Sequence, residues 1–482
     1  MILAEASPAA SHAPIPSLIW VAPFVALLLC IAILPLLKKT EHWWHHNQSK
    51  LIVAVLLGIL TLTYYLLREF GSAVHDPFLV KLFHTIGLHV HEHDGHHLAE
   101  PGLANAAAAL GNGLMEYIPF MSLLFSLYVI SGGITVRGDI PAHPRTNVAF
   151  LAIGGVMASL IGTTGASMLL IRPLLKTNSE RKHVVHTVIF FIFIVSNIGG
   201  TLLPIGDPPL FLGYLKGVPF LWTLGLWKEW AFTIALLLVI YYAWDSLAYK
   251  KETFPDIRRD ETLVEKLSIS GKINFLFLAG VVLATGTLAP GRPFMGTSWE
   301  PFTFCRELTQ TAFVLLSLAL TPKGLRKENN FNYVAILEVA CLFIGIFVCM
   351  QVPIEILNAE GSALGIDSPR KFFWATGLLS SFLDNAPTYV VFFETAKAMA
   401  AGAGPGFMDI IGGGHIQLDF LVAISLGAVF MGANTYIGNG PNFMVKSIAE
   451  HAGVKMPSFF GYMLFSACVL MPTFVVMMLV FL

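Results

Sequence analysis

The chain has 482 residues, of which 55% are hydrophobic and 12% are charged, and its formal net charge is −1. Soluble globular proteins carry about 25% charged residues, so this composition, with a mean hydropathy of +0.71, excludes an ordinary soluble domain. In a membrane protein the placement of charged residues along the chain matters more than the net charge. We expect no nucleic acid partner. The sequence predicts a multi-pass protein of the lipid bilayer.

Apolar segments of about 20 residues can cross a bilayer as helices. Ten such segments lie near residues 15–37, 49–69, 113–136, 184–214, 227–249, 273–290, 306–322, 332–352, 417–446 and 457–482. Two further apolar stretches, near 146–175 and 372–398, have polar centres, LIGTTGAS and FLDNAPT. Each of these predicts two half-length helices around a turn, a re-entrant hairpin that enters and leaves the membrane by one face.

Two of the predicted spans cannot be continuous helices. Segment 184–214 contains SNIGGTLLPIGDPPL, and segment 417–446 contains ANTYIGNGPNF. Proline removes a backbone donor and glycine lowers helix propensity, so both helices should break at mid-membrane. Such backbone is tolerated only where protein or a watery cavity surrounds it. A pair of broken helices, one in each half of a chain, points to the binding site of a secondary transporter.

The predicted elements divide the chain into two halves. Residues 1–249 and 273–482 each contain five spans and one hairpin, and a charged linker, 250–272, joins them. Because five is odd, the second half should run in the inverted orientation. Most Lys and Arg residues collect on one side if the N-terminus is outside, which makes the linker cytoplasmic. The predicted fold is all-α, with two inverted repeats that permit alternating access.

The hairpin tips and the two breaks supply hydroxyls, amides and two acids. The candidate cation-binding residues are Thr163, Thr164, Asn197, Asp207, Asp384, Asn385, Thr388, Asn434, Thr435 and Asn439. Oxygen ligands of this kind suit a small hard cation such as sodium, and carbonyls at half-helix ends can complete its shell. Half-helix N-termini would equally accept a carboxylate substrate. The residue types alone therefore leave both ligands open.

The two acids favour a mechanism of cation exchange. Burial disfavours the ionised form of a carboxyl group and a nearby cation favours it, so one acid can hold a proton or a metal ion in turn. Asp384 is the first candidate for this role, with Asp207 assisting, and Asp384→Asn should abolish transport. The alternative is that each acid caps the N-terminus of a half-helix.

Other titratable residues are weaker candidates. Glu116 and Glu338, one in each half, are secondary candidates for proton handling, or else interfacial acids exposed to water. Histidines cluster in the predicted outer loop 70–112, and clustered histidines can bind zinc or copper, although a solvent-exposed loop tip is the simpler interpretation. The cluster comprises His89, His91, His93, His96 and His97. No nucleophile–base pair, phosphate loop or metal triad indicates an enzyme, and we expect no cofactor besides sodium.

At these motifs the chain resembles the ion transporter superfamily. SNIGGTLLPIGDPP at 196–209 is similar to the broken-helix signature of NhaD-type sodium/proton antiporters, and SSFLDNAPT at 380–388 to their second-hairpin signature. ANTYIGNGPNFMVKSIAEHAGVKMPSFFGYM at 433–463 resembles a subgroup named both sodium/proton antiporter and citrate transporter, the CitMHS-like branch. The resemblance implies a dimer, elevator-like movement, and cation binding between the hairpin tips and the unwound helices. Dicarboxylate symporters of this superfamily carry Ser-Asn-Thr at the tips, which this chain lacks.

Three functions remain open at this point. The first is a sodium (or lithium)/proton antiporter, and the second is a cation-coupled symporter of citrate or a dicarboxylate. The acid at the second tip would repel such an anion unless a cation intervened. A channel or a metalloid permease is the third, but the predicted inverted repeat favours alternating access, and no cysteine lies near either tip. Chain length and compact loops indicate the inner membrane of a bacterium.

Overall fold

Helices make up nearly all of the regular structure. We describe a computed structural model of the chain, in which residues 14–37, 39–93, 96–262, 264–294, 297–329, 331–360, 365–400, 404–411 and 413–482 are placed. Within those ranges the strands form only three two-stranded sheets. The predicted fold class, an all-α membrane protein, is therefore confirmed.

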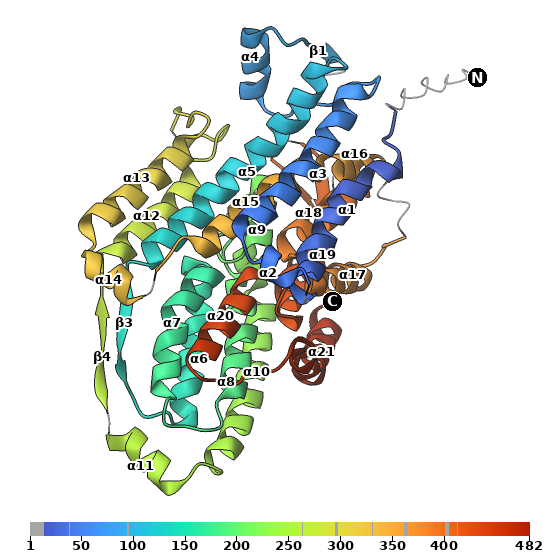
Figure 1. Cartoon of the computed structure of the whole chain (residues 1–482). Helices are drawn as coiled ribbons and strands as arrows, with labels where there is room; N and C mark the ends of the chain where they lie inside the picture. Colours follow the sequence, from blue (N-terminus) through green and yellow to red (C-terminus); the bar gives the residue numbers. More distant parts are fainter. Residues whose placement is uncertain are drawn as a thin grey trace.

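An outer layer of helices runs along one side of the molecule (Figure 1). It consists of α1 (Ala22–Ile33), α3 (Asn47–Leu67), α5 (Leu103–Ser131), α12 (Ile273–Thr287), α13 (Cys305–Leu320) and α15 (Val334–Cys349). Helix α3 exposes Ile52, Leu56 and other large apolar side chains on one face, as expected toward lipid. Its other face packs on α15, where Ala54 meets Gly345. Small residues at such a contact let two membrane helices approach closely.

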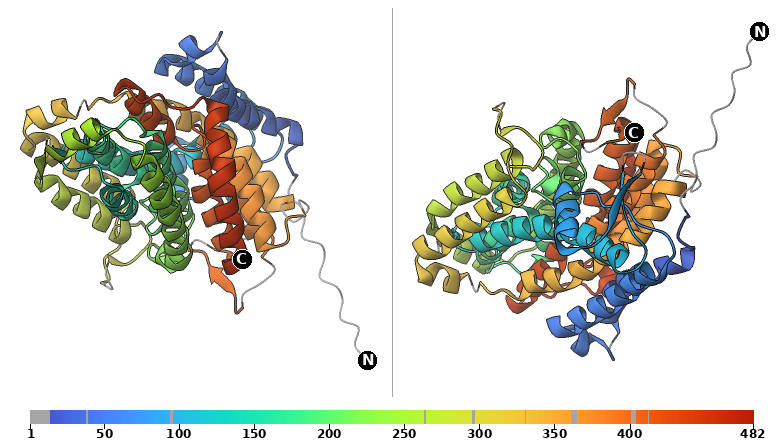
Figure 2. Two further views of the ribbon diagram at one scale, coloured as in Figure 1. Left: turned by 90° about the horizontal axis from the view of Figure 1, so that it is seen from below. Right: turned by 90° about the horizontal axis from the view of Figure 1, so that it is seen from above.

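A second group of helices packs against this layer and contains both helix breaks. It consists of α6 (Pro144–Ile161), α7 (Thr163–Thr177), α8 (Val185–Ile194), α9 (Pro208–Leu215), α10 (Trp227–Tyr249), α16 (Gln351–Glu360), α17 (Pro369–Phe382), α18 (Asn385–Ala398), α19 (Leu418–Met431), α20 (Gly440–His451) and α21 (Phe459–Phe481). Helices α8 and α19 are apolar and buried on nearly all sides, as expected of central helices. Figure 2 shows α12–α13 and α1–α3 toward opposite ends of the molecule.

Short elements join these helices. The short α-helices are α2 (Glu41–Trp44), α4 (Pro77–Ile86), α11 (Phe254–Thr262) and α14 (Lys323–Glu328), and the 3-10 turns are Leu18–Val21, Leu34–Leu36, Ile198–Thr201, Trp222–Leu226 and Gly432–Asn434. The antiparallel strand pairs are β1 (Val90–His93) with β2 (His96–Ala99), β3 (Thr135–Asp139) with β4 (Glu265–Ser270), and β5 (Phe407–Asp409) with β6 (His415–Gln417). The linker 250–272 thus contains α11 and β4, and its strand pairs with the one that follows α5 (Figure 1).

Fewer helices than expected are long enough to cross a membrane unaided. In the placed part of the chain there are five, Asn47–Leu67, Leu103–Ser131, Pro144–Ile161, Trp222–Tyr249 and Phe459–Phe481, or six with the pair α15–α16, which bends by 42°. Segments 184–214 and 417–446 are broken, as their Pro and Gly residues predict. Segments 273–290 and 306–322 form helices of 15 and 16 residues, which are shorter than a full crossing. Counted by helix length and hydropathy, the described residues therefore give fewer than the ten expected crossings.

Two helix boundaries differ from the expectation in ways that affect the site. Helix α5 begins at Leu103, ten residues before the expected start at 113, because the alanine-rich run before Gly111 has high helix propensity. Glu116 therefore lies inside a helix and not near its end. Helix α6 has 18 residues, so the first arm of the expected hairpin is longer than half a span.

Candidate functional site

Both helix breaks have the same local construction. Helix α8 ends at Ile194 and α9 begins at Pro208, and Asp207 precedes α9 in extended backbone with φ −142° and ψ 141°. Helix α19 ends at Met431, and Asn439 precedes α20 with φ −152° and ψ 141°. Each break passes through a 3-10 turn, Ile198–Thr201 in the first and Gly432–Asn434 in the second. Asp207 and Asn439 therefore occupy equivalent positions.

Glycines allow the backbone of each break to cross itself. A Cβ atom at Gly206 would lie 2.2 Å from the carbonyl oxygen of Gly200, and one at Gly438 would lie 2.6 Å from that of Gly432. Real Cβ atoms do not approach backbone so closely, so only glycine fits. The spacing of six residues is the same in both pairs. The polar side chains that follow, Asp207 and Asn439, depend on this crossing for their positions.

Gly206→Ala should lower the thermal unfolding midpoint of the purified protein by several degrees and reduce the folded yield. The added methyl group would collide with backbone that cannot move aside, and clashes of this kind cost about 1–3 kcal/mol or more. Gly440→Ala is the matched control, because a Cβ at Gly440 in the second break meets no atom within 4 Å. Equal midpoints for the two variants would contradict a tight crossing at Gly206.

A pair of helices brings a tip to each break. Helices α6 and α7 turn at Gly162, whose φ of 80° favours glycine, and the amide of Thr163 donates to the carbonyl of Gly206 at 2.8 Å. Helices α17 and α18 turn at Leu383 and Asp384, and Nδ2 of Asn434 in the second break donates to the hydroxyl of Ser381, near the end of α17, at 2.9 Å. The tips and the breaks therefore meet at one place.

The Asp207 carboxylate lies at the centre of this meeting point and is 1% exposed. Its Oδ1 accepts from the hydroxyl of Thr163 at 2.9 Å and from Nδ2 of Asn439 at 3.0 Å. Its Oδ2 accepts from Nδ2 of Asn385 at 2.7 Å. The three donors come from the first tip, the second break and the second tip, so residues from both halves of the chain surround one carboxylate.

A second network of amides lies beside the carboxylate. Asn439 also donates to Oδ1 of Asn197 at 3.2 Å, and Asn197 donates to Oδ1 of Asn442 at 2.7 Å. Asn442 in turn donates to the carbonyls of Gly432 and Thr435, at 2.8 and 2.9 Å. The prediction omitted Asn442 from the site, although it stands in the same polar motif, two residues after the glycine that begins α20.

Asp384 is less central than the sequence suggested. It is half-buried at the start of α18, where its carboxylate accepts from the amide of Ala386 at 3.1 Å. This is the helix-capping arrangement that was the alternative interpretation. Its neighbour Asn385 reaches Asp207, so Asp384 stands at the edge of the site.

The remaining predicted residues are of two kinds: some form hydrogen bonds that hold the local backbone, and others have side-chain oxygens without a hydrogen-bond partner. The hydroxyl of Thr388 donates to the carbonyl of Asp384 at 3.0 Å, and that of Thr435 donates to the carbonyl of Ser381. Thr164 is half-buried beside Thr163. The amide oxygens of Asn385 and Asn434 are buried and accept no hydrogen bond from the placed residues.

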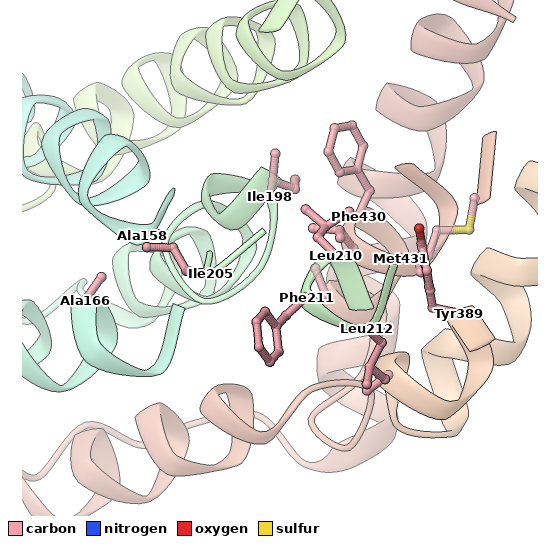
Figure 3. Packing of buried hydrophobic residues seen from close by; sticks show 14 of the residues in the cluster. Ala158, Ala166, Ile198, Ile205, Leu210, Phe211, Leu212, Tyr389, Phe430 and Met431 are labelled. Carbon is pink, nitrogen blue, oxygen red and sulfur yellow. The ribbon is translucent and has the colours of Figure 1, made fainter. Parts of the chain in front are cut away.

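The apolar surroundings of the site come from both breaks. Ile198 and Ile205 of the first break and Leu210 of α9 are buried, as are Phe430 and Met431 at the end of α19. Figure 3 shows these side chains converging around the unwound segments, with Tyr389 of α18 nearby. Such a shell excludes water and strengthens electrostatic interactions within it.

The two secondary candidates each form an ion pair away from Asp207. Glu116 lies 2.8 Å from Nζ of Lys216, which also lies 3.0 Å from Glu394 of α18. Glu338 lies 2.7 Å from Nζ of Lys50, and its side chain is 44% exposed. The structure therefore does not bring Glu116 and Glu338 into the carboxylate site.

The histidine-rich loop forms the hairpin β1–β2. His91 lies beside Glu100, and the backbones of His93 and His96 pair with each other. The side chains of His93 and His96 lie outside the described part of the structure. Among the residues described, no group of three His, Cys, Asp or Glu side chains is arranged to hold a metal ion.

Comparison with known proteins identifies the family. A sequence model of the family described as "Putative citrate transport" matches residues 13–87 and 98–482, which is nearly the whole chain and includes both tips and both breaks. No curated protein matches the chain in a search of their sequences. The apolar helices and this match together show a multi-pass membrane transport protein. The chain belongs to the citrate transport family defined by that model.

Proposed function

We propose that the chain is a secondary active transporter that exchanges sodium for protons by alternating access, with Asp207 holding the two cations in turn. One observation carries this proposal. Asp207 is 1% exposed, and its contacts in the described structure come from neutral donors, Thr163, Asn385 and Asn439. An ionised carboxylate without a cationic partner is costly in such surroundings. It therefore needs a proton or a metal cation.

The same surroundings contain ligands for sodium. The carboxylate oxygens of Asp207 and the hydroxyl of Thr163 face one another, and a half-turn of the Asn385 amide would replace its donor with its unpaired oxygen. Carbonyls of the unwound segments can complete the shell. When sodium leaves, a proton can neutralise the carboxylate instead. This competition couples the two ions.

Other predicted residues take supporting roles in this proposal. Asn197 links the first break to Asn442 of α20, Asn434 and Thr435 shape the second break, and Thr164 and Thr388 line the tips. Asp384 is a second carboxylate at the edge of the site, where it would attract the incoming cation. Glu116 and Glu338 would relay protons only if their ion pairs open.

The architecture that we propose around the site is a pair of inverted repeats, 1–249 and 273–482, joined by a cytoplasmic linker at 250–272. The support is that one order of elements occurs twice: α5, the pair α6–α7, the broken α8–α9 and α10 in the first half, and α15, the pair α17–α18, the broken α19–α20 and α21 in the second. We further propose a non-enzymatic homodimer in the inner membrane of a bacterium. The superfamily resemblance implies the dimer, and chain length and compact loops indicate the location.

The second candidate function is cation-coupled import of citrate or a dicarboxylate. The family description favours it. In that case sodium at Asp207 is the coupling ion, and its charge offsets the repulsion between the site carboxylates and the substrate.

Transport by purified protein in liposomes distinguishes the two functions. An imposed sodium gradient should move protons, reported by a lumenal pH dye, with no organic anion present. Protein-free liposomes and liposomes with a potassium gradient are the controls. If protons move only after citrate or a dicarboxylate is added, the antiporter proposal is wrong and the symporter takes its place.

A further inference from the structure

A basic cavity lies away from the Asp207 site, at the far ends of two helices that begin there. Its volume is about 660 Å³, and its walls include Arg172 and Lys176 of α7 and His451 of α20. Helix α7 starts at Thr163 and α20 starts just after Asn439, and the two helices pack together (Figure 1). At 1.5 Å per residue, Arg172 stands about 14 Å along α7 from Thr163. The charge bias of the loops predicts that this face lies in the cytoplasm.

Arg172 has an uncompensated charge at this cavity. Its Nη1 atom is buried without a hydrogen-bond partner in the described structure, and none of the residues that line the cavity is Asp or Glu. Lys176, in contrast, pairs with Glu265 of β4. An arginine that merely extended toward water would have hydrated nitrogens. Arg172 lines the cavity and is half-buried, and a guanidinium there can bind a planar oxyanion with two parallel hydrogen bonds.

Basic side chains near helix C-termini are common because they offset the helix dipole. That explanation accounts for His451 at the end of α20, but it does not account for the buried, unpartnered Nη1 of Arg172.

We propose that this cavity is a binding site for a soluble di- or tricarboxylate, with Arg172 as its main ligand and His451 as a second donor. This inference extends the second candidate function, the import of citrate or a dicarboxylate. It rests on that function only for the role of the bound anion in transport. Binding can be measured without transport. It adds an anion site that is separate from the cation site at Asp207.

The test is equilibrium binding of citrate to the full-length protein in nanodiscs of neutral phosphatidylcholine, by isothermal titration calorimetry without sodium. Arg172→Gln should raise the dissociation constant at least tenfold. Lys446→Gln is the matched control, because Lys446 lies on α20 but does not line the cavity, and it should change the constant less than twofold. A thermal unfolding midpoint near that of the unchanged protein shows that Arg172→Gln is folded.

Each other result would overturn the proposal in a recognisable way. Equal affinity of Arg172→Gln and the unchanged protein excludes Arg172 as the ligand. Equally tight binding of inorganic phosphate, or displacement of citrate by phosphatidylglycerol in the nanodisc, assigns the cavity to phosphate or to a lipid headgroup. Asp207→Asn should still bind citrate without sodium, and loss of binding in that variant would show one site instead of two. If citrate does not bind but sodium still drives proton movement, only the anion site fails.

Discussion

Replacing Asp207 by asparagine should abolish sodium-driven proton movement while leaving the protein folded. Asparagine has the same shape and its oxygen can still accept from Thr163 and Asn439, while a half-turn of the Asn385 amide lets its unpaired oxygen accept from the new Nδ2, so the hydrogen-bonded frame of the site is retained. Asparagine cannot ionise, so it can neither bind and release the exchanged proton nor give sodium a full negative charge. A loss of ~3 kcal/mol of cation binding corresponds to roughly a hundredfold weaker affinity. Initial rates of lumenal pH change in liposomes measure the effect.

Asp384→Asn is the informative comparison for this variant. Asparagine caps helix N-termini about as well as aspartate, so the contact with the amide of Ala386 survives and only the charge is removed. We expect a smaller loss of rate than for Asp207→Asn, because Asp384 is half-buried and stands at the edge of the site. Full transport in Asp207→Asn with none in Asp384→Asn would reverse this ranking and return Asp384 to the central role that the sequence suggested.

The sequence predicted the location of the site better than its internal order. Pro208 and Pro441, with the glycines before them, mark both breaks unmistakably, because those residues cannot continue a helix. Which acid lies at the centre depends on how the two halves pack, and periodicity carries no information on that. Asp384 and Asn385 are neighbours in sequence, yet only Asn385 reaches Asp207. The backbone turn at the second tip directs one side chain inward and the other to its own helix.

Long-range ion pairs were also beyond the reach of the sequence. Glu116 was identified as a candidate because it resembled Glu338 in placement. Its partner Lys216 lies 100 residues away, at the end of a helix whose position depends on the first break.

The start of helix α5 was predicted too late for a simpler reason. The alanines before Gly111 are good helix formers but only weakly hydrophobic, so a search for apolar spans begins α5 too late.

The largest effect on stability is expected from Asp245→Asn. Asp245 on α10 forms two hydrogen bonds with the guanidinium of Arg181, at 2.6 and 3.2 Å, and their side chains are 0% and 3% exposed. The same carboxylate contacts His186 of α8 at 2.9 Å and accepts from Asn147 of α6 at 3.2 Å. One acid therefore ties together the helices that carry the first tip and the first break.

Removing one member of a buried ion pair leaves the other charge unpaired, which costs about 3–5 kcal/mol. Arg181 keeps a weaker contact with Glu252, whose carboxylate lies 3.8 Å from its Nε, so the loss should fall near the lower end of that range. The thermal unfolding midpoint in detergent measures it. Glu450→Gln, which breaks the exposed pair with Lys446 on α20, is the control and should leave the midpoint almost unchanged, because exposed pairs contribute little. The double variant Asp245→Asn with Arg181→Gln should recover part of the loss, since the charge of Arg181 is then removed and the buried carboxylate of Glu252 keeps its hydrogen bonds from the amides of Lys182 and His183. Equal midpoints for Asp245→Asn and Glu450→Gln would show that this pair does not hold the helices together.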